Sequence, residues 1–270
     1  AIVDRANGHQ PFIDGSLILV CNGEIYNHER IRNELRTMGA RFSTRCDVEV
    51  ILHGYRIWGV DVLNKLNGQF AFAIWDTDRR ELLIARDRFG IVPLVWTKRG
   101  GRFSFASEVK ALLTQTNLRA ELSPGALDDF LAMRYAGEPG TFFQGIFHLM
   151  PGHFMKVKDG EPDEPKRWYK THRSGEANGS TPDIGEATDE LLSLLERAVS
   201  RRRQGEVPIG IYLSGGVDSS VVGSIASNGE GPLLAFSHGF DDRHDELKNA
   251  RAANQTIDGE MHEVLLKPSD

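Results

Sequence analysis

One stretch of the chain, Ser214-Gly215-Gly216-Val217-Asp218-Ser219-Ser220, has residue types that suit the binding of phosphate. The apolar run Val207–Leu213 before it predicts a short buried strand, and Val221–Ala226 after it predicts the start of a helix. Backbone N–H groups and the helix dipole attract an anion to such a turn, and glycines let a phosphate come close. The lysine-containing pattern of a Walker A loop is absent. The stretch predicts a phosphate site of another kind, and the alternative is an ordinary Ser/Gly turn.

A second stretch with suitable chemistry is Asn22-Gly23-Glu24, which follows the apolar strand predicted over Leu17–Cys21. The side-chain amide of Asn22 and the backbone N–H of Gly23 are uncharged donors, as an oxyanion hole requires. The carboxylates of Glu24 and Asp47 could receive a substrate ammonium. The alternative is a β-turn, for which Asn-Gly is a frequent dipeptide.

Composition limits the class of protein. The 270 residues are 40% hydrophobic and 26% charged, which is ordinary for a globular protein. A net charge of −6 favours neither nucleic acid nor an anionic membrane as a partner, and no segment approaches ~18 consecutive apolar residues. The two cysteines, Cys21 and Cys46, fit a reducing cytosol and predict a cytoplasmic location, and the nine histidines have no metal-ligand spacing.

Residues 1–157 predict one domain. Strands and helices do not alternate strictly here, which favours antiparallel sheet covered by helices. Ser123-Pro124 predicts the start of a helix. Apolar segments predict strands at Leu17–Cys21, Gly68–Trp75, Glu81–Ala85 and Arg102–Ala106, and helical periodicity predicts helices at Asn27–Met38 and Val48–Trp58.

Residues 158–182 are rich in Gly, Pro, Glu, Lys and Ser, which predicts a linker. From residue 183 to 270 strands and helices alternate, which favours a doubly wound parallel sheet that binds ligands beyond the carboxyl ends of its strands. The predicted elements of this second domain are helix Ile184–Arg203, strands Val207–Leu213, Leu233–Gly239 and His262–Leu266, and helix Asp245–Thr256.

Several strings of residues, taken in chain order, resemble the glutaminase domain of glutamine-dependent asparagine synthetases. The loop Ser214–Ser220 resembles the pyrophosphate loop of the ATP pyrophosphatases, and the order of the two domains is that of the synthetase family. The resemblance implies an α/β protein with an N-terminal αββα sandwich of the N-terminal-nucleophile hydrolase type. The strings are Asn22–Asn27, Asp47–Ile51, Asn67–Asp76, Arg86–Ile91 and Phe105–Leu112, with Ala1–Asp4, Gln10-Pro11 and Gly145–His153 at either end of the domain.

The resemblance also implies a role for individual residues. Asn22 and Gly23 would form the oxyanion hole, Asp47 and Glu24 would hold the α-amino group of glutamine, and Asp218 would bind Mg²⁺ with ATP. The glutamine contacts implied are Ile2, Val3, Asn22, Gly23, Glu24 and Asp47, and the ATP contacts implied are Leu213, Ser214, Gly215, Gly216, Asp218, Ser219, Ser220 and His238.

The function implied is that of a C–N ligase with glutamine, aspartate and ATP as substrates. Ammonia from glutamine would meet β-aspartyl-AMP and give asparagine, and the sequence leaves a homodimer open. One alternative is a related amidotransferase, or an enzyme like β-lactam synthetase, that acts on another carboxylate. Another is a non-catalytic glutaminase-like regulatory or binding module.

The sequence lacks the family's N-terminal cysteine, the arginine just before the Ile-Val segment and the SGEGADE-like segment at the far end, and it differs at His238. The family's nucleophile is a cysteine at the mature N-terminus, whereas Cys21 and Cys46 suit packing better than attack. We therefore interpret the chain as an internal fragment and expect it to be inactive by itself. His238 stands where the family usually has an aliphatic residue, and it could stack on adenine or be a core histidine.

Overall fold

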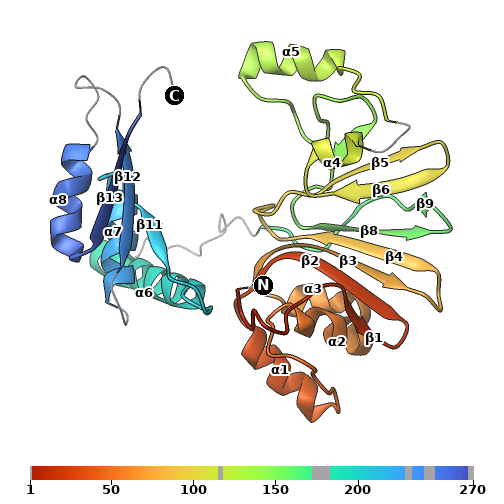
Figure 1. The fold of residues 1–270 in the computed structure, drawn as a ribbon, viewed down its shortest axis with the longest axis horizontal. Coiled ribbons are helices and arrows are strands. Elements are labelled where there is room, and N and C mark those ends of the chain that lie inside the picture. The colour runs from red at the N-terminus through yellow and green to blue at the C-terminus, as the bar shows by residue number, and fades with distance from the viewer. Residues whose placement is uncertain (1, 115–117, 172–182, 229–232, 240–246, 267–270) are drawn as a thin grey trace. The chain divides into compact units, whose positions relative to one another are not determined.

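The computed structural model describes residues 2–114, 118–171, 183–228, 233–239 and 247–266 (Figure 1). The chain divides into two compact units, formed mainly by residues 3–174 and 175–270. Each unit has its own sheet and its own hydrophobic core, as expected for domains.

The first unit is built on an antiparallel sheet with the strand order β1-β2-β3-β4-β8-β10, in which β9 also pairs with β8. Strands β2 and β3 are the longest pair, and they align over their whole length, from Leu17 opposite Asp76 to Ile25 opposite Gly68. The strands of this sheet are β1 (Phe12–Asp14), β2 (Leu17–Ile25), β3 (Gly68–Asp76), β4 (Glu81–Arg86), β8 (His153–Lys158), β9 (Glu161–Pro162) and β10 (Lys166–Arg167).

A smaller antiparallel sheet of the first unit has the order β6-β5-β7, with β5 at Val95–Arg99, β6 at Arg102–Ala106 and β7 at Ile146–His148. It packs on the larger sheet through a buried cluster. Ala71 and Ala73 of β3 contribute to this cluster together with Leu94 and Met155. Because alternate residues of a strand point to opposite faces, Phe70 and Phe72 of β3 point to the other side.

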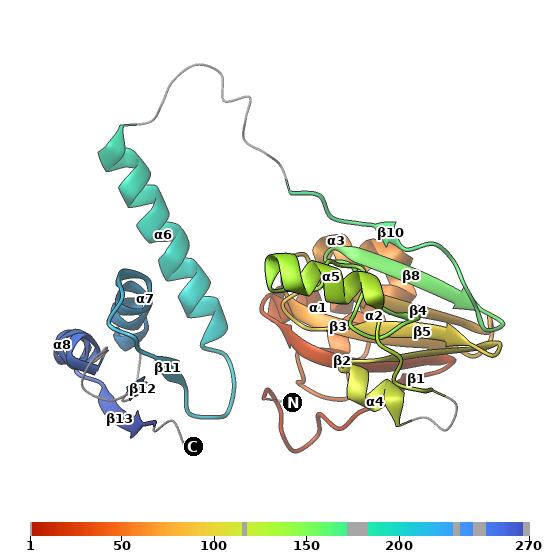
Figure 2. The same ribbon diagram turned by 90° about the horizontal axis from the view of Figure 1, so that it is seen from above.

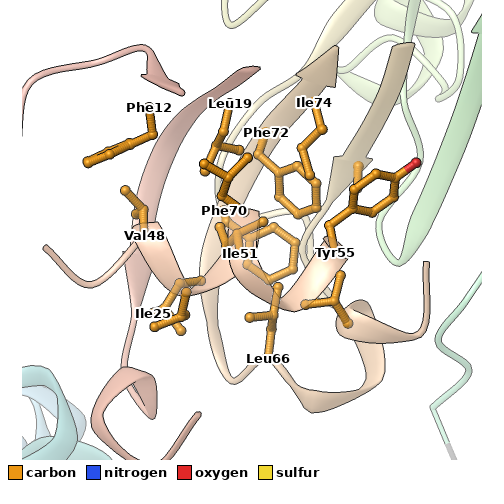
Figure 3. Packing of buried hydrophobic residues seen from close by; sticks show 14 of the residues in the cluster. Phe12, Leu19, Ile25, Val48, Ile51, Tyr55, Leu66, Phe70, Phe72 and Ile74 are labelled. Carbon is orange, nitrogen blue, oxygen red and sulfur yellow. The ribbon is translucent and has the colours of Figure 1, made fainter. Parts of the chain in front are cut away.

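Three helices cover that other side of the larger sheet, namely α1 (His28–Thr37), α2 (Glu49–Trp58) and α3 (Val62–Lys65), with a short 3₁₀ turn at Gly59–Asp61. Figure 3 shows Ile51 and Tyr55 of α2 packed against Phe70, Phe72 and Ile74 of β3. Ile51 and Phe70 are 0% and 1% exposed. This is the largest buried cluster among the described residues, and it fixes α2 against the sheet.

Two helices lie beyond the smaller sheet, α4 (Val109–Leu113) and α5 (Pro124–Met133). Leu112 of α4 packs with Val95 and Ile146. The order of layers is helices, sheet, sheet, helices (Figure 1), which confirms the predicted αββα sandwich. The cap of α5 is also confirmed, since Ser123 accepts a hydrogen bond from the N–H of Ala126.

The predicted linker was too long at its start. Residues 158–167 are part of the larger sheet, because β9 and β10 both pair with β8. Trp168 then packs on the core beside Phe70. Linker composition misled the prediction because short polar strands at the edge of a sheet have the same residue types as linkers. Residues 172–182 of the predicted linker lie outside the described residues.

The second unit has a parallel sheet in the order β11-β12-β13. The sheet packs against the helices through a cluster that contains the buried Leu213, Ala235 and Ile257 and the partly buried Ile211. Figure 2 shows the helices α6, α7 and α8 next to the strands. The described helices pack on one face of the sheet, so the described residues show a parallel α/β sheet, and the second helical layer of a doubly wound fold stays a prediction. The elements are α6 (Ile184–Arg202), β11 (Gly210–Tyr212), α7 (Val217–Ser227), β12 (Leu234–Gly239), α8 (Leu247–Ile257) and β13 (Glu260–Leu265).

Helix α6 has nearly the bounds predicted for it, Ile184–Arg203. Asp183 caps it by accepting the N–H of Gly185 at 3.0 Å, and Arg201 and Arg202 lie in its last turn, where cations suit the dipole. The start predicted for α8, Asp245, lies outside the described residues. Among the helices that the structure describes, none is both long enough and apolar enough to cross a membrane.

Replacement of Phe70 by alanine tests the large core. We expect Phe70→Ala to lower the free energy of unfolding of the first unit by about 3–5 kcal/mol, because it leaves a cavity that the packed sheet and helices cannot fill. Tryptophan fluorescence in a urea titration measures this unit alone, since Trp58, Trp75, Trp96 and Trp168 all lie in it. The control is Phe89→Ala, because Phe89 is 65% exposed. Equal losses in both variants would contradict this description of the core.

Candidate functional site

Asn22 and Gly23 lie inside strand β2. They pair with Ala71 and Phe70 of β3, and the strand continues to Ile25. The β-turn alternative is therefore wrong, and the strand predicted to end at Cys21 was too short. Pairing along the full length of β3 outweighs the local turn preference of Asn-Gly.

The glycine at position 23 is required by the close approach of β3. Its φ is +142°, and a Cβ there would lie 2.1 Å from the backbone oxygen of Gln69. A side chain would therefore force the two strands apart. The position that requires glycine is therefore one of the two residues of the predicted oxyanion hole.

The side chain of Asn22 lines a cavity of about 360 Å³ between the two sheets of the first unit. The amide nitrogen of Asn22 lies 3.5 Å from Oγ of Ser107, which follows β6. The cavity wall is otherwise mostly apolar and Asn22 is exposed, so its amide is an uncharged donor that a bound group can reach. The lining residues are Gln10, Val20, Cys21, Asn22, Ala71, Phe72, Ala73, Leu94, Phe105, Ala106 and Ser107.

Gln10 and Ser107 are cavity residues that the sequence analysis did not single out. The amide of Gln10 bonds the backbone of Cys21 twice, with its nitrogen 2.7 Å from the carbonyl and its oxygen 2.6 Å from the N–H. This pair of bonds holds the strand just before Asn22. Both residues lie in strings that carry the family resemblance, but neither residue type indicates the contact by itself.

Neither cysteine is suited to act as a nucleophile. Burial raises the pKa of Cys21 far above its ordinary value. Burial also raises the pKa of Cys46, to about 11. Both thiols therefore stay protonated near neutral pH, and a protonated thiol attacks poorly. This supports the prediction that both residues are packing residues.

Asp47 is the predicted ammonium ligand that the structure brings to β2. Its side chain is 3% exposed, and Oδ2 accepts the N–H of Ile25 at 2.8 Å. Asp47 thus lies at the end of the strand that carries Asn22 and Gly23. The other predicted glutamine contacts, Ile2, Val3 and Glu24, are half-buried.

The segment before Asp47, residues 43–46, is held by buried charged side chains, and we call it the 43–46 loop. Glu49 accepts the N–H and hydroxyl of Ser43, both at 2.8 Å, and the N–H and hydroxyl of Thr44 at 3.0 and 2.6 Å. Burial alone would raise the pKa of Glu49, but these bonds and the one from His53 outweigh it and lower the pKa to about 2. Glu49 is therefore an anion throughout the ordinary pH range.

In the second unit, the predicted phosphate loop joins β11 to α7. The helix begins at Val217, earlier than the predicted Val221, so Val217–Ser220 form its first turn. Hydroxyls organise the loop: Oγ of Ser214 lies 3.0 Å from Oγ of Ser219, and Ser220 donates to the carbonyl of Gly216 at 2.8 Å. The N-cap residue Gly216 supplies no side-chain cap, which leaves the N–H groups of the first turn to a ligand.

Gly215 allows this loop to pass close to α8. Its φ is +77°, and a Cβ would lie 2.4 Å from the backbone carbon of Asn249. The loop is therefore pressed between its own helix and α8. The interpretation of residues 214–220 as an ordinary Ser/Gly turn does not account for this packing.

Two predicted ATP contacts have different surroundings. Leu213 is 0% exposed in the core of the second unit, so only its backbone can face a ligand. His238 is half-buried, and its Nδ1 is hydrogen-bonded to the hydroxyl of Tyr212 on the neighbouring strand. His238 is thus not a core histidine, and it lies on the sheet face opposite the described helices.

Asp218 is exposed in the first turn of α7, beside Ser219 and Ser220. Its carboxylate and the neighbouring hydroxyls are oxygen donors of the kind that Mg²⁺ prefers, so the residues fit a magnesium ion that is bound together with phosphate. Within the described ranges, no three or more His, Cys, Asp or Glu residues are grouped so that they could hold a metal ion.

Comparison with known families assigns both units. Residues 1–169 match the family model of the glutamine amidotransferase domain, and residues 190–270 match that of asparagine synthase. The two matches lie in the two units of the structure. Together they cover the cavity at Asn22 and the loop at Ser214.

Three curated relatives are similar to the chain. A putative glutamine-hydrolysing asparagine synthetase of Mycobacterium tuberculosis is 38% identical over 100% of this chain and 43% of its own length. Asparagine synthetase 3 of Bacillus subtilis is 34% identical over 98% of this chain and 44% of its own length. The amidase chyE of Penicillium rubens is 33% identical over 84% of this chain and 34% of its own length. The chain spans less than half the length of these relatives.

The pH dependence of stability tests the charge of Glu49. A pKa of about 2 in the fold, against an ordinary 4.5, gives stability that is fully present above pH 4.5 and is lost as the pH falls towards 2. We expect Glu49→Gln to lower the free energy of unfolding by up to about 3 kcal/mol at pH 7, and to cost less as the pH falls from 5 to 3. Urea titrations with tryptophan fluorescence measure the difference. A difference that is constant with pH would contradict the shift.

Proposed function

Because this chain belongs to the glutamine amidotransferase domain family, we propose that its first unit binds glutamine for hydrolysis to glutamate and ammonia. The side chain of Asn22 and the N–H of Gly23 donate to the oxygen that becomes negative when the amide carbon is attacked. Asp47 and Glu24 hold the α-ammonium group, and Ile2 and Val3 line the site. The support for this is the position of Asn22 on a cavity beside the rigid β2–β3 pair.

The nucleophile of this hydrolysis is neither of the thiols of this chain. Cys21 and Cys46 stay protonated, and an N-terminal cysteine with a free amine performs the attack in enzymes of this type. We therefore expect the 270 residues to bind glutamine without hydrolysing it.

We propose that the second unit binds ATP and activates a carboxylate. The N-terminus of α7 and the loop Ser214–Gly216 hold the phosphates, and Asp218 holds Mg²⁺, which neutralises phosphate charge. The carboxylate of aspartate attacks the α-phosphorus, the bond to the β-phosphate breaks, and pyrophosphate leaves. Ammonia then attacks the carbonyl of β-aspartyl-AMP, and asparagine and AMP are released.

The observation that carries the proposal is the presence of both sites in one chain. A carboxylate does not react with ammonia in water until it is activated, and ammonia is mostly protonated near neutral pH. Adenylation in one unit and glutamine hydrolysis in the other remove both obstacles. A phosphate loop has no evident use in a glutaminase that acts alone.

A second candidate is an enzyme that amidates another carboxylate. The similarity to a protein named amidase, which covers 84% of this chain, favours keeping it. The described residues that bind glutamine and phosphate would have the same roles, and only the acyl substrate would differ.

Release of pyrophosphate from ATP by the full-length protein tests the acyl substrate. We expect aspartate to stimulate release at least about tenfold over ATP alone, and glutamate or malonate to stimulate it much less, because only the preferred carboxylate reaches the α-phosphorus. Stimulation by another carboxylate, with none by aspartate, would reject asparagine as the product and favour the second candidate.

Substitutions in α7 test the phosphate site. We expect Ser219→Ala to weaken ATP binding about tenfold, because Oγ of Ser219 bonds Ser214 and organises the loop. The matched control is Ser224→Ala, an exposed serine of the same helix. Calorimetric titration of the chain with ATP and with pyrophosphate measures both variants. Equal binding by the two variants would show that the loop does not hold phosphate.

A further inference from the structure

The 43–46 loop has almost all of its backbone polar groups bonded to side chains. Glu49 accepts the N–H groups of Ser43 and Thr44. Arg32 of α1 donates to the carbonyls of Thr44 and Cys46, at 2.8 and 2.6 Å. Such a loop cannot shift without breaking several buried hydrogen bonds, each of which is costly to leave unmade.

The same loop is tied to the N-terminal segment that contains Ile2 and Val3. Oδ2 of Asp4 accepts the N–H of Arg45 at 2.7 Å, and Oδ1 accepts the side-chain amide of Asn7 at 2.9 Å. The 43–46 loop therefore connects the two segments whose residues are expected to contact glutamine.

The buried charges around the loop do not balance. Three carboxylates, those of Asp4, Asp47 and Glu49, are at most 5% exposed, and the buried guanidinium beside them is that of Arg32, which is 6% exposed. The exposed guanidinium of Arg45 also attracts Asp4, so three carboxylates face two guanidinium groups. Arg32 lies 3.8 Å from Glu49. A buried carboxylate without a cation is expensive, so the excess of negative charge favours a ligand that brings a positive group.

Asp47 is the carboxylate left for that group. Glu49 is bonded by Ser43, Thr44 and His53. Asp47, in contrast, receives one strong donor, the N–H of Ile25, and the weak thiol donor of Cys46 at 3.6 Å. Its remaining lone pairs suit an ammonium group.

We propose that Glu49 and Arg32 are positioning residues, which hold the 43–46 loop so that Asp47 faces the α-ammonium group of the substrate. The inference rests on the proposed binding of glutamine. Neither residue touches the substrate. Asp47 follows Cys46, whose carbonyl is held by Arg32, and it precedes the helix on which Glu49 lies, so both neighbours of Asp47 are fixed.

Two ligands separate this role from a general structural one. L-Glutamine carries the α-ammonium group, whereas glutaramate has hydrogen in its place and is otherwise the same. If the loop only stabilises the fold, its loss affects both ligands alike. If it aims Asp47, its loss affects glutamine and leaves glutaramate nearly unchanged.

The experiment is calorimetric titration of the chain with each ligand. We expect the unaltered chain to bind glutamine more tightly than glutaramate, and Glu49→Gln and Arg32→Lys each to reduce this preference about tenfold. The affinity for glutaramate should change less than about twofold. Thr44→Ala, at a half-buried position, removes one bond to Glu49 and the acceptor of the N–H of Cys46. It keeps both charged side chains and should reduce the preference less, so it provides the test if Glu49→Gln and Arg32→Lys do not fold.

The control is Glu29→Gln, an exposed glutamate of α1, which should leave both affinities unchanged. Thermal melting followed by tryptophan fluorescence shows that each variant is folded at the titration temperature. An unchanged preference in folded variants, or an equal loss for both ligands, would overturn the positioning role alone. Failure of the unaltered chain to bind glutamine would overturn the proposed function and this inference with it.

Discussion

The pairing of β2 with β3 is the interaction on which the rest of the first unit depends. The two strands are aligned from Leu17 to Ile25. Both contribute side chains to the helix-covered core, and Ala71 and Ala73 of β3 also contribute to the core between the sheets. Gly23 allows the approach, since a Cβ would meet the backbone of β3. Loss of this pairing would remove both cores and the site at once.

Buried charge sets the second constraint. Arg32, Glu49 and Asp4 are placed where the 43–46 loop needs donors and acceptors, so the charges and the backbone groups satisfy one another. An apolar core would stabilise the fold as much as this buried charged network does. The advantage of the network is that it holds the loop in one conformation. A single conformation matters for this loop, because it leads to Asp47, the carboxylate proposed to bind the ammonium group of glutamine.

The predicted phosphate loop of the second unit is held by other means. Among the described residues no charged side chain bonds this loop and no side chain caps α7, and the backbone of α8 lies close to Gly215. Hydroxyls of Ser214, Ser219 and Ser220 complete the turn. An N-cap side chain would accept hydrogen bonds from the N–H groups of the first helical turn. Because α7 has none, these N–H groups stay available for an anion.

Much of the secondary structure could be predicted from the sequence, because it depends on local patterns of residues. Apolar periodicity placed the main strands and helices, and Ser123 indicated a helix start. Residues 214–220 predict a phosphate site, and the structure places them between a strand and a helix N-terminus. Long-range pairing decided what local patterns could not. It placed Asn22-Gly23 within a strand and residues 158–167 within a sheet. It also brought Asp4, Arg32 and Glu49 around one loop, since buried charges find partners far apart in sequence only once the chain has folded.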